Sequence, residues 1–146
     1  MIGSEPESVV AELDTFTHNI EGEDFGAILI RFKNRSIGIV EGSVCVYPEN
    51  LEETLSIFGE KGTVVLGGLA VNSIQTWRFD GSNEDIMVSQ NWESPDNVYG
   101  YGHTPLFKDM IESVNDDRTP YVDGREGRKG LGIILRAYTA EGKNVK

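Results

Sequence analysis

The spacing of apolar residues changes once along this chain, and this change limits the folds that the chain can adopt. From Ser8 to Phe79, apolar side chains recur at every second position, which is typical of β-strands. Beyond Val98 they recur at intervals of three and four residues, which is typical of α-helices. Because the predicted helices follow the strands and do not alternate with them, the sequence predicts an α+β fold with a mostly antiparallel sheet.

Turn signals divide the first part of the chain into about six predicted strands. These strands cover Ser8–Thr17, Phe25–Phe32, Ser36–Tyr47, Glu53–Glu60, Thr63–Leu66 and Val71–Phe79. The polar stretch Asp80–Asn97 follows them without a useful periodicity, and we expect it to be a mobile loop.

Two helices are predicted in the last third of the chain. The first begins at the capping residue Thr104, and the second begins at the capping residue Asp123. The apolar face of the first is expected to consist of Phe107, Met110, Ile111 and Val114, and that of the second of Leu131, Ile134, Leu135 and Tyr138. We expect both helices to pack on one face of an open sheet of about six strands.

The other face of this sheet is expected to need a partner. The predicted strands Phe25–Phe32 and Ser36–Tyr47 carry Val, Ile and Phe on both faces, so the uncovered face would expose a large apolar patch. We expect a second copy of the chain or a missing domain to bury this patch, and the alternative is that short flanking loops cover it. The length of 146 residues suits a single domain over residues 1–146.

The net charge argues against some classes of binding partner, and the cysteine content bears on the expected location. With 13 Lys and Arg against 24 Asp and Glu, the formal net charge is −11, which argues against binding to nucleic acid or to an anionic membrane surface. The sequence has no apolar run that could span a bilayer and no signal peptide at its N-terminus. One cysteine, Cys45, cannot form an internal disulfide, and a cytoplasmic location is expected.

Candidate catalytic residues are few. The sequence has neither a Gly-x-Gly-x-x-Gly fingerprint nor a phosphate-binding Walker loop, and its two histidines, His18 and His103, have no metal-ligand spacing. Cys45 lies between Val44 and Val46, so we expect it to be a small buried side chain in a strand. His18 alone is expected to be an ordinary loop residue.

The best candidate site is the glycine-rich segment Tyr99–Pro105, which leads into a predicted helix N-terminus. Free amides and the positive end of the helix dipole favour an anion there. Tyr99, Tyr101 and His103 could stack on a sugar or donate to a phosphate. The alternative interpretation is a flexible turn followed by a helix cap.

The order of several short motifs resembles that of the Gfo/Idh/MocA oxidoreductases, the relatives of glucose–fructose oxidoreductase and inositol dehydrogenase. The motifs are His103 before a helix, Arg118–Gly127, Ala140–Lys143 after a second helix, and, upstream, Glu5–Val9, Glu23–Asp24 and Leu55–Gly62. The resemblance covers nearly the whole chain. Within the family, the chain is most similar to members that act on nucleotide-linked or free sugars.

This resemblance implies a role on the substrate side of an enzyme. Members of the family have an N-terminal Rossmann domain that binds NAD or NADP, and a C-terminal α+β domain that forms the substrate pocket and the oligomer interface. The chain resembles the second domain alone, so the Rossmann domain of the parent chain is an expected partner. We expect the parent enzyme to be an NAD(P)-dependent oxidoreductase acting on CH–OH groups of a sugar, polyol or nucleotide-sugar. The chain by itself is expected to be inactive and to bind no cofactor or metal.

The resemblance also implies substrate contacts, because His103 matches a histidine that is common in the family just before this helix. His103, Tyr99 and Tyr101 are the first candidates, and His18 and Tyr47 are added because they lie near predicted strand ends. No catalytic residue of the family falls within this sequence. Two other functions stay open: a stand-alone, non-catalytic module for carbohydrate binding or assembly, and a small α+β enzyme with His103 as its base.

Overall fold

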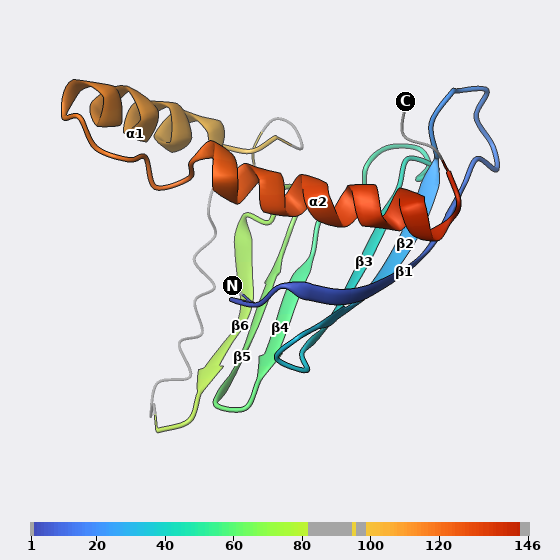
Figure 1. Ribbon diagram of the computed structural model, residues 1–146, viewed down its shortest axis with the longest axis horizontal. Coiled ribbons are helices and arrows are strands. Elements are labelled where there is room, and N and C mark those ends of the chain that lie inside the picture. The colour runs from blue at the N-terminus through green and yellow to red at the C-terminus, as the bar shows by residue number, and fades with distance from the viewer. Residues whose placement is uncertain (1, 82–94, 96–98, 144–146) are drawn as a thin grey trace. The chain divides into compact units, whose positions relative to one another are not determined.

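The structure is a computed structural model that describes residues 2–81, 95 and 99–143. Within these residues the strands are β1 (Pro6–Asp14), β2 (Phe25–Phe32), β3 (Ile37–Ser43), β4 (Leu55–Gly59), β5 (Gly62–Gly67) and β6 (Ser73–Phe79), followed by the helices α1 (His103–Asn115) and α2 (Gly124–Ala140) (Figure 1). The chain divides into two compact units. The first combines Met1–Tyr47 with Tyr121–Lys146, and the second is Pro48–Pro120.

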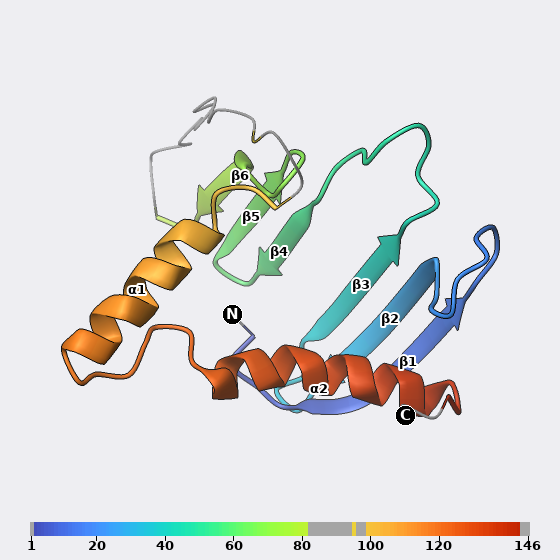
Figure 2. The same ribbon diagram turned by 90° about the horizontal axis from the view of Figure 1, so that it is seen from above.

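The first unit is an antiparallel sheet, in the order β1-β2-β3, with α2 packed on β1 (Figure 2). Residues that pair across the strands share a face, and Val9, Ile30 and Gly38 are such a row. The small core of this unit consists of Ala11, Ile30, Phe32 and Ala137. The apolar alternation of β1 and β2 therefore buries one face of the sheet, as the period-two pattern predicts.

Both ends of α2 are fixed by side chains. At the start, Asp123 accepts hydrogen bonds from the backbone amides of Arg125 and Glu126, so the predicted cap is confirmed. Near the other end, the Tyr138 hydroxyl donates to Glu23 Oε2 at 2.6 Å, in the turn between β1 and β2. This hydrogen bond lowers the pKa of Glu23 and raises the pKa of Tyr138. The helix is thereby tied to the turn that follows β1, the strand on which it packs.

The second unit is an antiparallel sheet, in the order β4-β5-β6, together with α1. The strands approach closely at Gly62, where an added Cβ would lie 2.5 Å from the Phe79 ring and 2.8 Å from the carbonyl oxygen of Arg78. Only glycine fits this position without a shift of the backbone. The pairing between β5 and β6 also contains an irregularity between Val65 and Leu66.

The α+β class is confirmed, and each predicted strand and helix has a counterpart among the described residues. The sheets and several strand bounds differ from the expectation, and the first strand, for example, ends at Asp14, three residues before its predicted end at Thr17. The strands form two three-stranded sheets, each within its own unit. The third strand ends at Ser43, four residues before its predicted end at Tyr47, and the Ser43 hydroxyl accepts a hydrogen bond from the Cys45 amide just beyond it. The predicted mobile loop Asp80–Asn97 falls largely outside the described residues.

The apolar stripes of the helices are more exposed than the periodicity predicts. On α1 the side chains of the predicted buried face are all exposed: Phe107, Met110, Ile111 and Val114. On α2 only Tyr138 of the predicted stripe is partly buried, whereas Leu131, Ile134 and Leu135 are exposed and Ala137 makes the buried contact. The prediction that these stripes are buried is therefore wrong for the described chain, because α2 meets β1 through a neighbouring face.

The open face of the first sheet agrees with the sequence. Val10, Leu29 and Ile39 pair across the three strands and form a continuous apolar row on the face opposite Ile30. All three are exposed, and Ile39 has an exposed fraction of 78%. The expected apolar surface on the uncovered side is therefore present. Neither of the described helices is long and apolar enough to cross a membrane.

Candidate functional site

The turn Tyr99–Gly102 carries two of the predicted site residues, Tyr99 and Tyr101, and leads into α1, which begins with the third, His103. Gly100 has a φ of +58°, and an added Cβ would lie 3.1 Å from the Ala70 Cβ, so the turn requires glycine there. The rings of Tyr99 and His103 meet edge to face, with 6.2 Å between their centroids. Tyr101 is exposed in the same turn. The structure therefore brings Tyr99 and His103 together and places Tyr101 beside them in sequence.

The N-terminus of α1 is the predicted anion-binding position. The helix begins at His103 with Gly102 as its cap, so Thr104 is not the cap that the sequence predicts. Glycine offers no side chain to the first amides, and the first turn of the helix has no acidic residue. Gly102 thus makes no side-chain cap to these amides, and the helix dipole favours a negatively charged group at this end of the helix.

A strained residue lies in the connection between β5 and β6, near the contact with Gly100. Val71 has a φ of +53°, which a β-branched residue rarely adopts. Beside it, the Ala70 amide donates to Asn72 Oδ1 at 3.3 Å. Such strain is often found at binding sites, where the surrounding structure holds it in place. The strain at Val71 agrees with a functional role for this end of the second unit.

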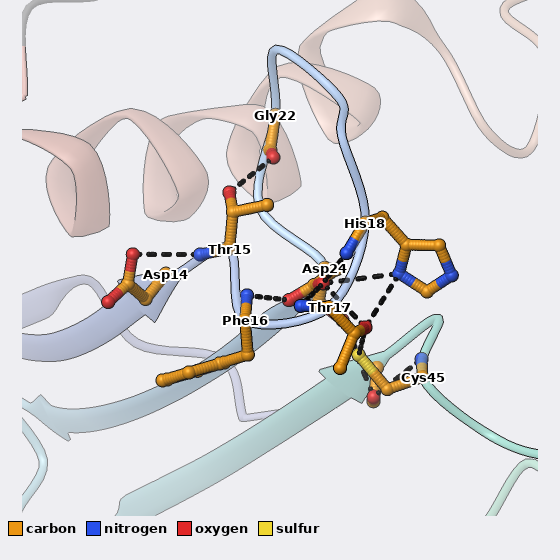
Figure 3. A network of polar contacts seen from close by, with 9 residues as sticks. Asp14, Thr15, Phe16, Thr17, His18, Gly22, Asp24 and Cys45 are labelled. Carbon is orange, nitrogen blue, oxygen red and sulfur yellow. Dashed lines mark hydrogen bonds and ion pairs between the residues drawn. The ribbon is translucent and has the colours of Figure 1, made fainter.

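In the first unit, Asp24 is the centre of a polar network (Figure 3). Asp24 is buried, with an exposed fraction of 1%, and its carboxylate accepts several hydrogen bonds. Asp24 Oδ1 accepts from the Phe16 amide at 2.8 Å, and Oδ2 accepts from the Thr17 amide at 2.7 Å and from the His18 amide at 2.9 Å. The network therefore fixes the turn between β1 and β2 from inside.

The same carboxylate holds the His18 ring. His18 Nδ1 lies 3.1 Å from Asp24 Oδ2 and 2.9 Å from the Thr17 hydroxyl. Burial by itself would raise the pKa of Asp24, but the amides of Phe16, Thr17 and His18 outweigh it and hold the pKa well below the ordinary value. Asp24 is therefore an anion in the folded protein at neutral pH.

Cys45 belongs to this network as well, and the prediction of a buried strand residue is wrong. β3 ends at Ser43, and Cys45 follows it as a free cysteine at the surface. Its sulfur lies 3.2 Å from Thr17 Oγ1, from a segment 28 positions away in the sequence. Cys45 thus lies just beyond the end of β3, with its sulfur within 4.8 Å of the ligand atoms of His18 and Asp24.

The predicted site residues thus fall into two groups. Tyr99, Tyr101 and His103 lie in the second unit, whereas His18 and Tyr47 lie in the first. The sequence analysis named Asp24 only within the motif Glu23–Asp24 of the family resemblance and did not identify it as a site residue. Its signals in the sequence are this motif and its place directly before the apolar strand β2.

The described residues do not fit a dinucleotide cofactor. Both sheets are antiparallel, and none of the described strands leads through a glycine fingerprint into a helix. The sequence has no Gly-x-Gly-x-x-Gly segment either. No hydride-transfer step is therefore assigned to residues of this chain.

Comparison with solved structures finds relatives in the dehydrogenases. The WlbA dehydrogenase from Bordetella pertussis, solved in complex with NADH and UDP-GlcNAcA, is 36% identical, with 93% of this chain and 40% of that chain covered and a TM-score of 0.81. The WlbA dehydrogenase from Chromobacterium violaceum, in complex with the same two molecules, is 34% identical, with 95% and 39% covered and a TM-score of 0.74. This chain thus spans about two fifths of the length of these structures.

A third structure shares the fold alone. It is the UDP-N-acetylglucosamine 3-dehydrogenase GnnA from Acidithiobacillus ferrooxidans, at 18% identity, with 94% of this chain and 41% of that chain covered and a TM-score of 0.68. No curated protein matches the chain. The family model described as "Oxidoreductase family, C-terminal alpha/beta domain" matches residues 2–146. Because this match extends over both units, the chain belongs to the Gfo/Idh/MocA oxidoreductase family, as its C-terminal domain.

Proposed function

We propose that this chain is the substrate-binding and oligomerisation domain of an NAD-dependent dehydrogenase that acts on a nucleotide-linked sugar. The observation that carries the proposal is the 36% identity, over 93% of the chain, to a dehydrogenase solved with NADH and UDP-GlcNAcA. A second relative at 34% identity was solved with the same pair of molecules. Oxidation of a nucleotide-linked sugar is one of the reactions in the wider class of sugar and polyol dehydrogenases.

The substrate contacts are proposed for the turn Tyr99–Gly102 and the start of α1. The start of α1, which has no side-chain cap and no acidic residue in its first turn, suits a phosphate or carboxylate of the substrate. The exposed rings of Tyr99 and Tyr101 suit stacking on a sugar, and His103 suits a hydrogen bond to a hydroxyl. His18 and Tyr47, in the other unit, stay predictions.

The open face of the first sheet is proposed as the contact with a second copy of the chain. Val10, Leu29 and Ile39 form an exposed apolar row there, and such a row is stabilised by removal from water. The charge of −11 gives no reason to expect nucleic acid or an anionic membrane as a partner. The remaining part of the enzyme, which supplies the cofactor site, is the second proposed partner.

The alternative function is a stand-alone, non-catalytic module that binds a small carbohydrate or assembles. A coding sequence with no Rossmann-coding stretch upstream of this chain would favour it. Under this alternative, the ligand binds to the chain but no oxidation follows. The two functions therefore differ in turnover and not in binding.

The test is a kinetic assay of the enzyme that contains this chain, with NAD⁺ or NADP⁺ and UDP-linked sugars. We expect turnover with NAD⁺, and we expect His103→Ala to lower kcat/KM for the sugar at least about tenfold while the affinity for NADH is unchanged. Lys108→Ala, an exposed change on the same helix, is the matched control and should leave both values unchanged. Binding of UDP-GlcNAcA without any turnover would support the stand-alone module. Unchanged kinetics of His103→Ala would remove His103 from the substrate site.

A further inference from the structure

Three side chains with metal-binding atoms converge at one end of the first unit (Figure 3). His18 Nδ1, a carboxylate oxygen of Asp24 and Cys45 Sγ all lie within 4.8 Å of one another. His18 and Asp24 come from the turn between β1 and β2, and Cys45 comes from the segment after β3. The cluster therefore joins two segments that are distant in the sequence.

The Thr17 hydroxyl lies between the three atoms. Thr17 Oγ1 is 2.9 Å from His18 Nδ1, 2.9 Å from Asp24 Oδ2 and 3.2 Å from Cys45 Sγ. Zinc–ligand distances are about 2.0–2.3 Å, so an ion at this point would draw each ligand inward by roughly 1 Å. The Thr17 hydroxyl occupies this position in the structure. The Thr17 side chain must therefore rotate away before an ion can bind there.

The three ligand types match a borderline-soft divalent cation. Imidazole nitrogen, carboxylate oxygen and thiolate sulfur are the ligands of Zn²⁺ in proteins, whereas Mg²⁺ and Ca²⁺ prefer oxygen alone. Three protein ligands leave a fourth position of the tetrahedron for water. The His18 side chain is 46% exposed, so an ion can reach the cluster from solvent.

The surroundings of Asp24 suit a metal ligand. The amides of Phe16, Thr17 and His18 orient the carboxylate without using any side chain. An ion would replace the contacts of the Thr17 hydroxyl with Asp24, His18 and Cys45, and the contact of Asp24 Oδ2 with His18 Nδ1. The amide contacts of the carboxylate would remain. Such outer hydrogen bonds commonly orient metal-binding carboxylates.

We propose that His18, Asp24 and Cys45 form a binding site for Zn²⁺ or a similar divalent transition-metal ion. The bound ion links the turn between β1 and β2 to the segment after β3. It therefore stabilises the end of the sheet at which Glu23 also accepts the hydrogen bond from the Tyr138 hydroxyl. Its three ligands are not among the residues of the second unit that are proposed to bind substrate, and His18, which the sequence predicted as a substrate contact, would serve here as a metal ligand.

The test is titration of the purified chain with Co²⁺, followed by displacement with Zn²⁺. The chain has one cysteine and two histidines, so a thiolate-to-cobalt charge-transfer band can come only from Cys45. We expect this band with one equivalent of Co²⁺, its loss on addition of Zn²⁺, and its absence in Cys45→Ser. His18→Ala should weaken binding at least about tenfold, whereas His103→Ala, the change at the other histidine, should bind as the unmodified chain does.

Two further measurements keep the test independent of folding. Far-UV circular dichroism of each variant establishes that it is folded, and Zn²⁺ should slow alkylation of Cys45 in the unmodified chain but not in His18→Ala. The proposal is overturned if Co²⁺ gives no charge-transfer band, or if Cys45→Ser and His18→Ala bind Zn²⁺ as tightly as the unmodified chain. Equal weakening by His103→Ala and His18→Ala would also overturn it, because the binding would then not be local to the cluster.

Discussion

Two isoleucines on neighbouring strands test how the first sheet is covered. Ile30 on β2 is 3% exposed and faces the same side as Ala11, whereas Ile39 on β3 is 78% exposed on the opposite side. The same substitution, isoleucine to alanine, therefore removes the same atoms from a covered and from an uncovered face. A difference in the free energy of unfolding between the two variants therefore reflects side-chain burial and not side-chain chemistry.

The expected costs differ severalfold. Ile30→Ala leaves a cavity and should lower the free energy of unfolding by about 2–5 kcal/mol. Full burial of such a side chain contributes about 1.5–3 kcal/mol, and roughly one fifth of Ile39 is buried, so Ile39→Ala should cost about 0.3–0.6 kcal/mol in the monomer. For a chain of this length, each kcal/mol lowers Tm by about 2–4 °C.

The assay is urea denaturation followed by far-UV circular dichroism, at a protein concentration at which the chain is monomeric. Equal costs for the two variants, or a larger cost for Ile39→Ala, would refute the assignment of the two faces. Repeating the assay at high protein concentration then tests the proposed contact between copies. If the open face is that contact, the cost of Ile39→Ala rises with concentration, whereas the cost of Ile30→Ala stays constant.

Two more predictions concern backbone positions and pH. Gly130→Ala, in the interior of α2, should raise the free energy of unfolding by about 1 kcal/mol, since nothing lies within 4 Å of the added Cβ. Gly62→Ala should lower the free energy of unfolding, because the added Cβ would lie 2.8 Å from a backbone carbonyl oxygen. Urea denaturation of the two variants measures the sign of both changes. The folded-state pKa of Asp24 lies below its ordinary value of 3.8, so its contribution to stability is complete above that value and should be lost as the pH falls below it. Asp24→Asn should remove this acid-dependent loss from the pH profile of the urea midpoint, and an unchanged profile would contradict the assignment.

The order and type of the secondary structure followed from the sequence because they depend on local spacing. A period of two predicted the strands, and a period near 3.6 predicted the helices. Asp123 as a cap was predictable for the same reason, since a capping side chain acts only on amides two and three residues away. The family resemblance also needed only the order of short motifs, and the family model over residues 2–146 confirms it.

Tertiary structure decided what depends on residues far apart in the chain. The thiol of Cys45 contacts Thr17, which is 28 positions away in the sequence, just beyond the end of β3 at Ser43, and no periodicity marks that end. Asp24 is a buried, fully hydrogen-bonded carboxylate because a turn closes around it, although its sequence reads as a solvated turn. The exposed apolar stripe of α1 is another feature that the sequence pattern alone did not predict. An apolar period indicates which side of a helix avoids water, but the surface that covers this side is specified by other segments.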